Sequence, residues 1–176
     1  MNRLCPFALA LGSITLTACS TVADLPTERL AAASMTRANG VPAGTVQLLA
    51  SGNHLSLVVA VTGLPEGLHG FHLHAVGACN APDFSTAGGH LNPSGKDHGS
   101  LSPGGSHLGD LPNLDVGSSN ITLTTIDLDD DRTQVLSWLF DDDGTAVVIH
   151  ADADDYMTNP SGNAGSRIAC GILKPA

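Results

Sequence analysis

Basic residues are scarce in this chain of 176 residues, which has 7 Lys and Arg against 17 Asp and Glu and a formal net charge of -10. The lysines are Lys96 and Lys174 alone. So acidic a chain is repelled by nucleic acid and by anionic lipid. We therefore expect no nucleic-acid partner and no attachment to a membrane through a basic surface.

Aromatic residues and long apolar runs are also few. Aromatics make up 3% of the sequence, whereas glycine occurs 20 times, a balance that suits tight turns around an aliphatic core. The apolar run from Leu4 to Thr17 follows Asn2 and Arg3 and is shorter than the roughly 20 residues of a membrane-spanning helix. Residues 1–18 are therefore predicted to be an export signal and not part of the fold.

The export signal ends in Leu16-Thr17-Ala18-Cys19, which resembles the bacterial lipobox. We expect lipidation at Cys19, a tether over residues 19–40, one domain over residues 41–176, and a periplasmic or cell-envelope protein that touches the membrane only through its lipid anchor. An ordinary signal peptide cleaved nearby, with Cys19 incidental, is the alternative. Both readings place the mature chain outside the cytoplasm.

Cysteine is the next scarce residue, with four in the chain. Cys5 is lost with the signal and Cys19 is assigned to lipid, which leaves Cys79 and Cys170. Two cysteines in an oxidising compartment usually pair, and this pair would close a loop of about 90 residues, worth about 4 kcal/mol in the chain-entropy model. We expect this disulfide in the folded protein.

Short runs rich in Val, Ile, Leu and Thr, bounded by turn residues, dominate the rest of the chain. They predict an all-β fold, a Greek-key antiparallel β-barrel or sandwich with two long functional loops. The loops are residues 75–119 and 151–166, and the first is too long to be an idle connection. The predicted strands are residues 45–50, 54–62, 68–74, 120–128, 133–140, 145–150 and 167–173.

Histidines are concentrated in the strand ends and loops. His72 and His74 are two apart on a predicted strand and therefore share a face. Alone, such a pair could be two solvent-facing residues. However, three more histidines and an aspartate follow at short spacing and a further histidine ends a strand, a set of ligands that suits copper and zinc better than calcium or magnesium. These residues are His90, His98, His107, Asp110 and His150.

Five ordered motifs in these regions resemble the copper/zinc superoxide dismutase family, from about Thr45 to Lys174. The resemblance implies an enzyme that dismutates superoxide to oxygen and hydrogen peroxide, with one copper and one zinc per subunit. The motifs are Gly70-Phe71-His72-Leu73-His74, Gly88-Gly89-His90-Leu91-Asn92-Pro93, Lys96-Asp97-His98-Gly99, His107-Leu108-Gly109-Asp110-Leu111 and residues 162–171.

The resemblance also implies a role for each ligand. His90 would bridge the two metals as an imidazolate and take part in catalysis by accepting a proton. The copper ligands would be His72, His74, His90 and His150. The zinc ligands would be His90, His98, His107 and Asp110.

Three groups around the ligands receive supporting roles from the same resemblance. Arg167 would guide the anion in catalysis, although an ordinary surface arginine is the alternative. Asp154 would accept hydrogen bonds from His72 and His98, although a solvated acidic turn is the alternative. A Cys79–Cys170 bridge would pin the arginine loop to the metal-bearing loop. His54 and His69 match no ligand position and are expected to be ordinary strand or turn residues.

Other functions remain to be tested. A metal-buffering lipoprotein could use the same ligands without turnover, and a structural envelope lipoprotein would leave its histidines incidental. Relatives that bind copper alone lack the zinc ligands that are complete here. The short interval from His74 to Cys79 reshapes a region often at the family's subunit contact, so monomer and homodimer both stay open.

Overall fold

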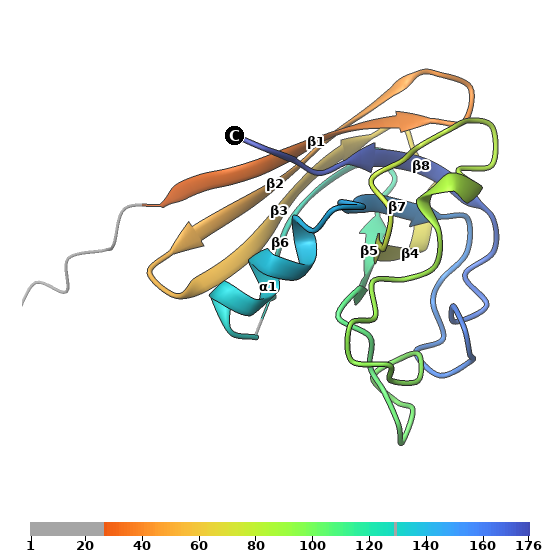
Figure 1. Cartoon of the computed structure of the whole chain (residues 1–176). Coiled ribbons are helices and arrows are strands. Elements are labelled where there is room, and N and C mark those ends of the chain that lie inside the picture. The colour runs from red at the N-terminus through yellow and green to blue at the C-terminus, as the bar shows by residue number, and fades with distance from the viewer. Residues whose placement is uncertain (1–26, 129) are drawn as a thin grey trace, which may run out of the picture.

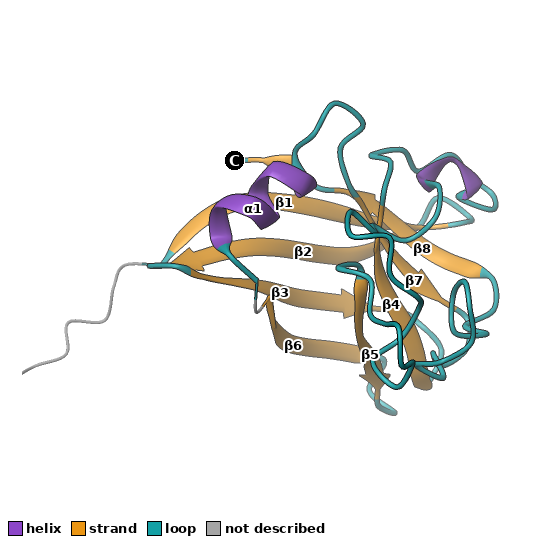
Figure 2. Cartoon of the chain, turned by 60° about the horizontal axis from the view of Figure 1, so that its bottom comes forward, coloured by secondary structure: helices purple, strands orange, loops and turns teal. Residues whose placement is uncertain are grey.

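The computed structural model describes residues 27–128 and 130–176, and its regular elements are mostly strands, joined by loops (Figures 1 and 2). The predicted signal over residues 1–18 and the predicted lipidation site Cys19 lie outside these residues. The strands are β1 (Glu28–Arg37), β2 (Pro42–Ser51), β3 (His54–Thr62), β4 (Gly67–His74), β5 (Asp110–Val116), β6 (Ile121–Leu128), β7 (Ala146–His150), β8 (Arg167–Ile172) and β9 (Lys174–Pro175). The helical segments are the 3-10 turn η1 (Ser85–Ala87) and the helix α1 (Arg132–Leu139).

The strands form one antiparallel sheet in the order β5-β4-β7-β8-β1-β2-β3-β6, with β9 added beside β1. The edge strands β5 and β6 contact each other, so the sheet curls into a nearly closed barrel. The chain passes from β3 to β4 and from β6 to β7 across the barrel, because neither pair is adjacent in the sheet. The prediction of an all-β antiparallel barrel or sandwich is confirmed, and the fold is a nearly closed barrel.

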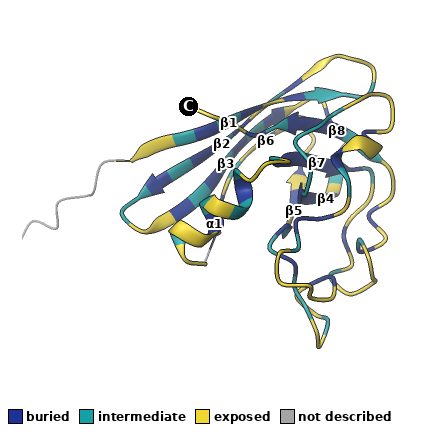
Figure 3. Cartoon of the chain, viewed as in Figure 1, coloured by how far each residue is buried: buried dark blue, intermediate teal, exposed yellow. Residues whose placement is uncertain are grey.

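Alternation of buried and exposed residues explains how the barrel is filled. In β3 the side chains of Leu55, Leu57, Val59 and Val61 are at most 2% exposed, while the intervening residues face outward. This period of two is what a strand with one face on the core requires. The buried bands run along the strands in Figure 3, so the core is the aliphatic interior of the barrel.

The predicted tether over residues 19–40 is wrong in its second half, because Glu28–Arg37 is the first strand. Ala31, Ala33 and Met35 are buried at every second position, and β1 pairs with β2, β8 and β9. Alanine is a weak strand former, so the alternation carries little signal in the sequence. Tertiary packing of small residues under neighbouring strands decides this element.

The predicted strand over residues 133–140 is also wrong, since the helix α1 occupies Arg132–Leu139. The Asp131 carboxylate accepts a hydrogen bond of 3.1 Å from the Gln134 backbone N–H, which caps the first turn. Val135 and Leu139 are buried one helical turn apart. Spacing of i and i+4, with an aspartate before it, is the helical signal that the prediction overlooked.

The long loop predicted over residues 75–119 contains a further strand, β5, at its end. Pro112 interrupts the strand pattern in the sequence, and the structure accommodates it because β5 is an edge strand. The rest of this loop and the loop 151–166 lie together at one end of the barrel (Figures 1 and 2). None of the helical segments in residues 27–128 and 130–176 has the length and apolar character needed to cross a membrane.

Candidate metal centre

Two neighbouring strands carry the first three histidines. His72 and His74 alternate on β4, and His150 ends β7, which pairs with β4 through Phe71 and Ile149. All three histidines are buried, at 0%, 1% and 4% exposure. The ring centroids of His72 and His150 are 4.8 Å apart, and those of His74 and His150 are 5.7 Å apart. The sheet register thus brings the three imidazoles together.

His90 joins this group from the long loop. An isolated antiparallel bridge ties His90 to His74, and the His90 ring lies 4.0 Å from the His72 ring and 5.1 Å from the His98 ring, between centroids. A single imidazole therefore stands between two clusters. One cluster is His72, His74, His90 and His150, and the other is His90, His98, His107 and Asp110, with ligand atoms in each cluster within 4.8 Å of one another.

The first cluster fits a metal ion because it leaves buried nitrogens without partners. Among the described residues, five buried side-chain polar atoms lack a hydrogen bond, and four of them are ring nitrogens of this cluster. A buried unpaired polar atom costs about 1–3 kcal/mol, so four converging ones need a common partner. The atoms are His72 Nδ1, His74 Nε2, His90 Nε2 and His150 Nε2.

Hydrogen bonds on the opposite ring nitrogens orient these lone pairs inward. His74 Nδ1 donates to the Gly88 carbonyl at 2.9 Å, and His150 Nδ1 donates to the Gly165 carbonyl at 3.2 Å. Burial lowers the pKa of His74 to about 2, of His150 to about 3 and of His90 to about 4, with neighbouring histidines adding to the effect. The rings are therefore neutral, which is the form that binds a metal.

The second cluster gathers three imidazoles around one carboxylate. The Nδ1 atoms of His90, His98 and His107 lie 2.8, 3.0 and 3.0 Å from Asp110 Oδ1. Asp110 Oδ2 accepts the backbone N–H groups of Gly99 and His107, at 2.8 and 2.9 Å. Burial alone would raise the pKa of Asp110, but these hydrogen bonds and the histidines outweigh it and lower the pKa, so the carboxylate is ionised. Three imidazoles and one carboxylate are a donor set that zinc uses.

Asp154 lies between the two clusters. Its Oδ2 accepts a hydrogen bond of 2.7 Å from His72 Nε2, and its Oδ1 accepts one of 3.0 Å from His98 Nε2. Burial would raise the pKa of this carboxyl, but the histidine bonds prevail and hold it at about 2. Asp154 is 3% exposed, so it does not lie in a solvated acidic turn.

Arg167, at the start of β8, borders the first cluster. Its Nη1 donates to the Phe84 carbonyl and its Nη2 to the Gly88 carbonyl, both at 2.6 Å. Burial of the half-covered guanidinium lowers its pKa below the usual value, although arginine stays cationic. With His74, His90 and His150, Arg167 lines an open cavity of about 430 Å³. A cation at this position faces whatever small anion enters.

The predicted disulfide joins Cys79 and Cys170, with Cα atoms 5.7 Å apart and a sequence separation of 91. It ties the loop before η1 to β8, three residues beyond Arg167. Phe84, whose carbonyl holds the guanidinium, packs in a small cluster with Cys170 and Cys79. The bridge therefore fastens the segment that positions the arginine.

Two histidines stay outside both clusters, and one of them has an unexpected role. His54 is exposed, whereas His69 is 2% exposed, with Nδ1 2.8 Å from the His150 carbonyl and Nε2 2.9 Å from the Pro65 carbonyl. His69 thus fastens the turn before β4 to the end of β7. The sequence signal was its location in a strand with His72 and His74 but on the opposite face.

Similarity to known proteins follows the same residues. The family model described as copper/zinc superoxide dismutase matches residues 42–173. The chain is 37% identical to superoxide dismutase [Cu-Zn] 2 of Aquifex aeolicus over 93% of this chain and 95% of that protein. It is 48% identical to the superoxide dismutase-like protein YojM of Bacillus subtilis, over 62% of this chain and 57% of that protein.

Solved structures agree in fold. The crystal structure of a superoxide dismutase-like protein from Bacillus subtilis has a TM-score of 0.75 and 37% identity, covering 81% of this chain and 97% of that chain. Copper/zinc superoxide dismutase from Brucella abortus has a TM-score of 0.65 and 25% identity, covering 85% of this chain and 100% of that chain.

Proposed function

The chain belongs to the copper/zinc superoxide dismutase family, and from this premise we propose that it removes superoxide in the cell envelope at a copper joined to zinc through His90. It is a superoxide dismutase with copper and zinc as cofactors. The observation that carries the proposal is the set of four buried ring nitrogens without hydrogen-bond partners in the first cluster. This cluster shares His90 with the second cluster.

The donor sets favour one metal for each cluster. Four imidazole nitrogens beside an open cavity suit a redox-active copper, whereas three imidazoles and a carboxylate suit zinc. Copper would be held by His72, His74, His90 and His150, and zinc by His90, His98, His107 and Asp110. When bound, copper supplies one-electron chemistry that oxidises one superoxide to oxygen and reduces the next to hydrogen peroxide, with two protons consumed.

His90 is the residue of this chain that can hold one of those protons. Its Nε2 is buried and has no hydrogen-bond partner, while its Nδ1 faces Asp110 and the second cluster. A proton on Nε2 leaves Nδ1 free for zinc. The ring is therefore able to carry a proton at the copper side without leaving its place between the clusters.

Arg167 is proposed to bind and orient the anion. Its guanidinium is fixed by two carbonyls and faces the cavity that His74 and His150 also line. A preorganised cation attracts an anion most strongly where water is partly excluded. In a chain with only two lysines, this local positive charge replaces long-range steering by a basic rim.

The envelope location rests on different support. The sequence over residues 1–19 has the features of a lipoprotein signal, and a disulfide between Cys79 and Cys170 is typical of an oxidising compartment. Membrane fractionation of cells expressing the full chain tests it, with Cys19→Ser as the matched variant. Loss of membrane association in the variant is expected. A lipid anchor elsewhere would leave the variant in the membrane fraction.

The decisive experiment is metal analysis and a dismutation assay on the mature, disulfide-intact chain. About one copper and one zinc per chain, with dismutation that depends on copper, is the expected result. Two bound metals without turnover would support the metal-buffering alternative. Sedimentation velocity on the same sample decides between a monomer and the homodimer that the sequence left open.

A further inference from the structure

A β-bulge interrupts the pairing of β4 with β5 beside the metal centre. The register shifts between His69 and Phe71, so that Pro112 and Asn113 of β5 lie opposite Gly70 alone. A bulge leaves backbone groups out of the ladder and redirects side chains. Those backbone groups need other partners, because unpaired buried ones are costly.

The loop 151–166 provides these partners. The Gly70 N–H donates to the Asp152 carbonyl at 2.8 Å, and the Asn113 N–H donates to the Tyr156 hydroxyl at 2.8 Å. The Asn113 side chain engages both backbone groups of Asp154: its Nδ2 donates to the Asp154 carbonyl at 2.9 Å, and its Oδ1 accepts the Asp154 N–H at 2.8 Å. The loop 151–166 is therefore held by hydrogen bonds to the residues of the bulge.

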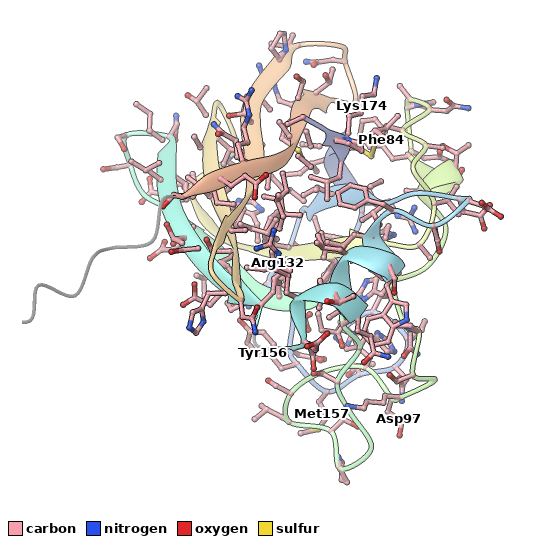
Figure 4. All side chains as sticks on the ribbon, turned by 60° about the vertical axis from the view of Figure 1, so that its left-hand side comes forward. Phe84, Asp97, Arg132, Tyr156, Met157 and Lys174 are labelled. Atoms are coloured by element: carbon pink, nitrogen blue, oxygen red, sulfur yellow. A yellow bond between two sulfur atoms is a disulfide. The ribbon has the colours of Figure 1, made fainter. Side chains whose placement is uncertain are left out.

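Tyr156 connects the bulge to the metal-bearing loop. Its N–H donates to Asp154 Oδ1 at 2.6 Å, and its carbonyl accepts the Leu101 N–H at 3.0 Å. Its φ of 60° is uncommon for an aromatic residue, so these contacts select its conformation. Figure 4 shows Tyr156 on the same side of the molecule as Met157 and Asp97, among the loops. One residue therefore touches β5, the Asp154 carboxylate and the loop between His98 and His107.

We propose that Tyr156 and Asn113 are positioning residues that hold the Asp154 carboxylate where it receives His72 Nε2 and His98 Nε2. They act through Asp154 and touch no reacting atom. Hydrogen bonds to ligand histidines set their tautomer and basicity, so the orientation of Asp154 governs how firmly His98 binds zinc and His72 binds copper. The inference rests on the proposed metal assignment.

Tyr156, the one tyrosine of the chain, allows a test that changes a single hydroxyl group. Tyr156→Phe removes only the hydroxyl that accepts from Asn113. Thr158→Val is the matched control, since Thr158 Oγ1 lies in the same loop but its hydrogen bonds are to Asp155 Oδ2, at 2.6 Å, and from Asn163 Nδ2, at 3.2 Å. The measurements are the rate of zinc transfer to a chelator, the visible spectrum of cobalt(II) in the zinc site, and the copper electron paramagnetic resonance spectrum.

We expect zinc to leave the Tyr156→Phe variant about tenfold faster than the unsubstituted protein, with a changed cobalt spectrum, and to leave Thr158→Val at the unsubstituted rate. Asn113→Ala should also accelerate zinc release. In the double variant, the acceleration should be smaller than the product of the accelerations in the two single variants. Should Asn113→Ala fail to fold, the Tyr156→Phe comparison decides alone.

Three results separate the possible failures. A Tyr156→Phe variant that keeps the zinc release rate and the cobalt spectrum overturns the positioning role. Equal acceleration in Thr158→Val also overturns it, because any loop change would then do the same. An unsubstituted protein that binds no zinc or copper contradicts the proposed function instead, and leaves the docking of the loop on the bulge without a metal to serve.

Discussion

Arg167 and His74 share one hydrogen-bond acceptor. The Gly88 carbonyl lies 2.6 Å from Arg167 Nη2 and 2.9 Å from His74 Nδ1. The cation that faces the cavity and a ligand of the first cluster are therefore fixed by the same peptide group, two residues before His90. Any change that moves this peptide therefore moves the Arg167 guanidinium and the His74 ring together.

Replacing Arg167 with glutamate should slow dismutation about tenfold to a hundredfold and leave the copper and zinc contents unchanged. The substitution reverses the charge facing the cavity without removing a ligand, and local fields alter association rates on this scale. Steady-state rates at several salt concentrations, with metal content, provide the measurement. Arg29→Glu is the control. Arg29 is exposed near the start of β1, and its replacement changes the net charge of the chain by the same amount. Equal rates in both variants would refute the anion-binding role.

The metal-free protein should lose stability as the pH falls below about 6.5. Burial depresses the native pKa values of His74, His90 and His150 to about 2, 4 and 3, so between those values and 6.5 the unfolded chain binds protons that the native chain excludes. The free energy of unfolding should therefore decrease by about 1 kcal/mol per histidine and pH unit in this window.

Urea unfolding of the metal-free protein at pH values of about 7.5, 6.5, 5.5 and 4.5 checks this pH dependence. The depressed pKa values of Asp110 and Asp154 add losses only below their usual value of 3.8. The metal-bound protein is the comparison, since its ring nitrogens are occupied and its decline should begin at lower pH. A flat profile down to pH 4.5 would contradict the neutral, buried imidazoles.

His90→Ala should abolish the coupling of the two metals. The variant keeps three ligands in each cluster but loses the ring that stands between them. We expect zinc affinity to fall at least about tenfold, together with a turnover rate that becomes strongly pH-dependent as the proton carrier is lost. Metal titration and a pH-rate profile provide the test. Retention of both metals with full turnover at every pH would show that the bridge is misassigned.

Removing the disulfide should destabilise the protein by about 4 kcal/mol, since Cys79 and Cys170 close a loop of 91 residues. Cys79→Ser with Cys170→Ser is the direct variant, and denaturant unfolding measures the loss. Because the bridge fastens the segment that carries the Phe84 carbonyl, turnover should fall at a temperature where the variant is still folded. Unchanged turnover there would mean that the segment holds Arg167 without the bridge.

The sequence determined most of the strand pattern and the chemistry of the ligands. Short runs rich in Val, Ile, Leu and Thr between turn residues favour strands, and so predicted an antiparallel barrel or sandwich. Six histidines and one aspartate gathered in and beside two loops have the chemistry of metal ligands, so the sequence predicted which residues form the site. The disulfide could also be predicted, because only two cysteines remained to pair.

Tertiary structure alone decided the rest. The alanine-rich β1 becomes a strand because its neighbours bury it, whereas the helix over residues 132–139 did have a local signal in the spacing of Val135 and Leu139. The bulge in β5 that holds Asp154 has one local signal, Pro112, but its hydrogen-bond partners in the loop 151–166 are set only by the fold. Likewise, the partners of Arg167 and Asn113 are backbone groups, and a sequence does not reveal which distant carbonyl or N–H group the folded chain brings within reach of a side chain.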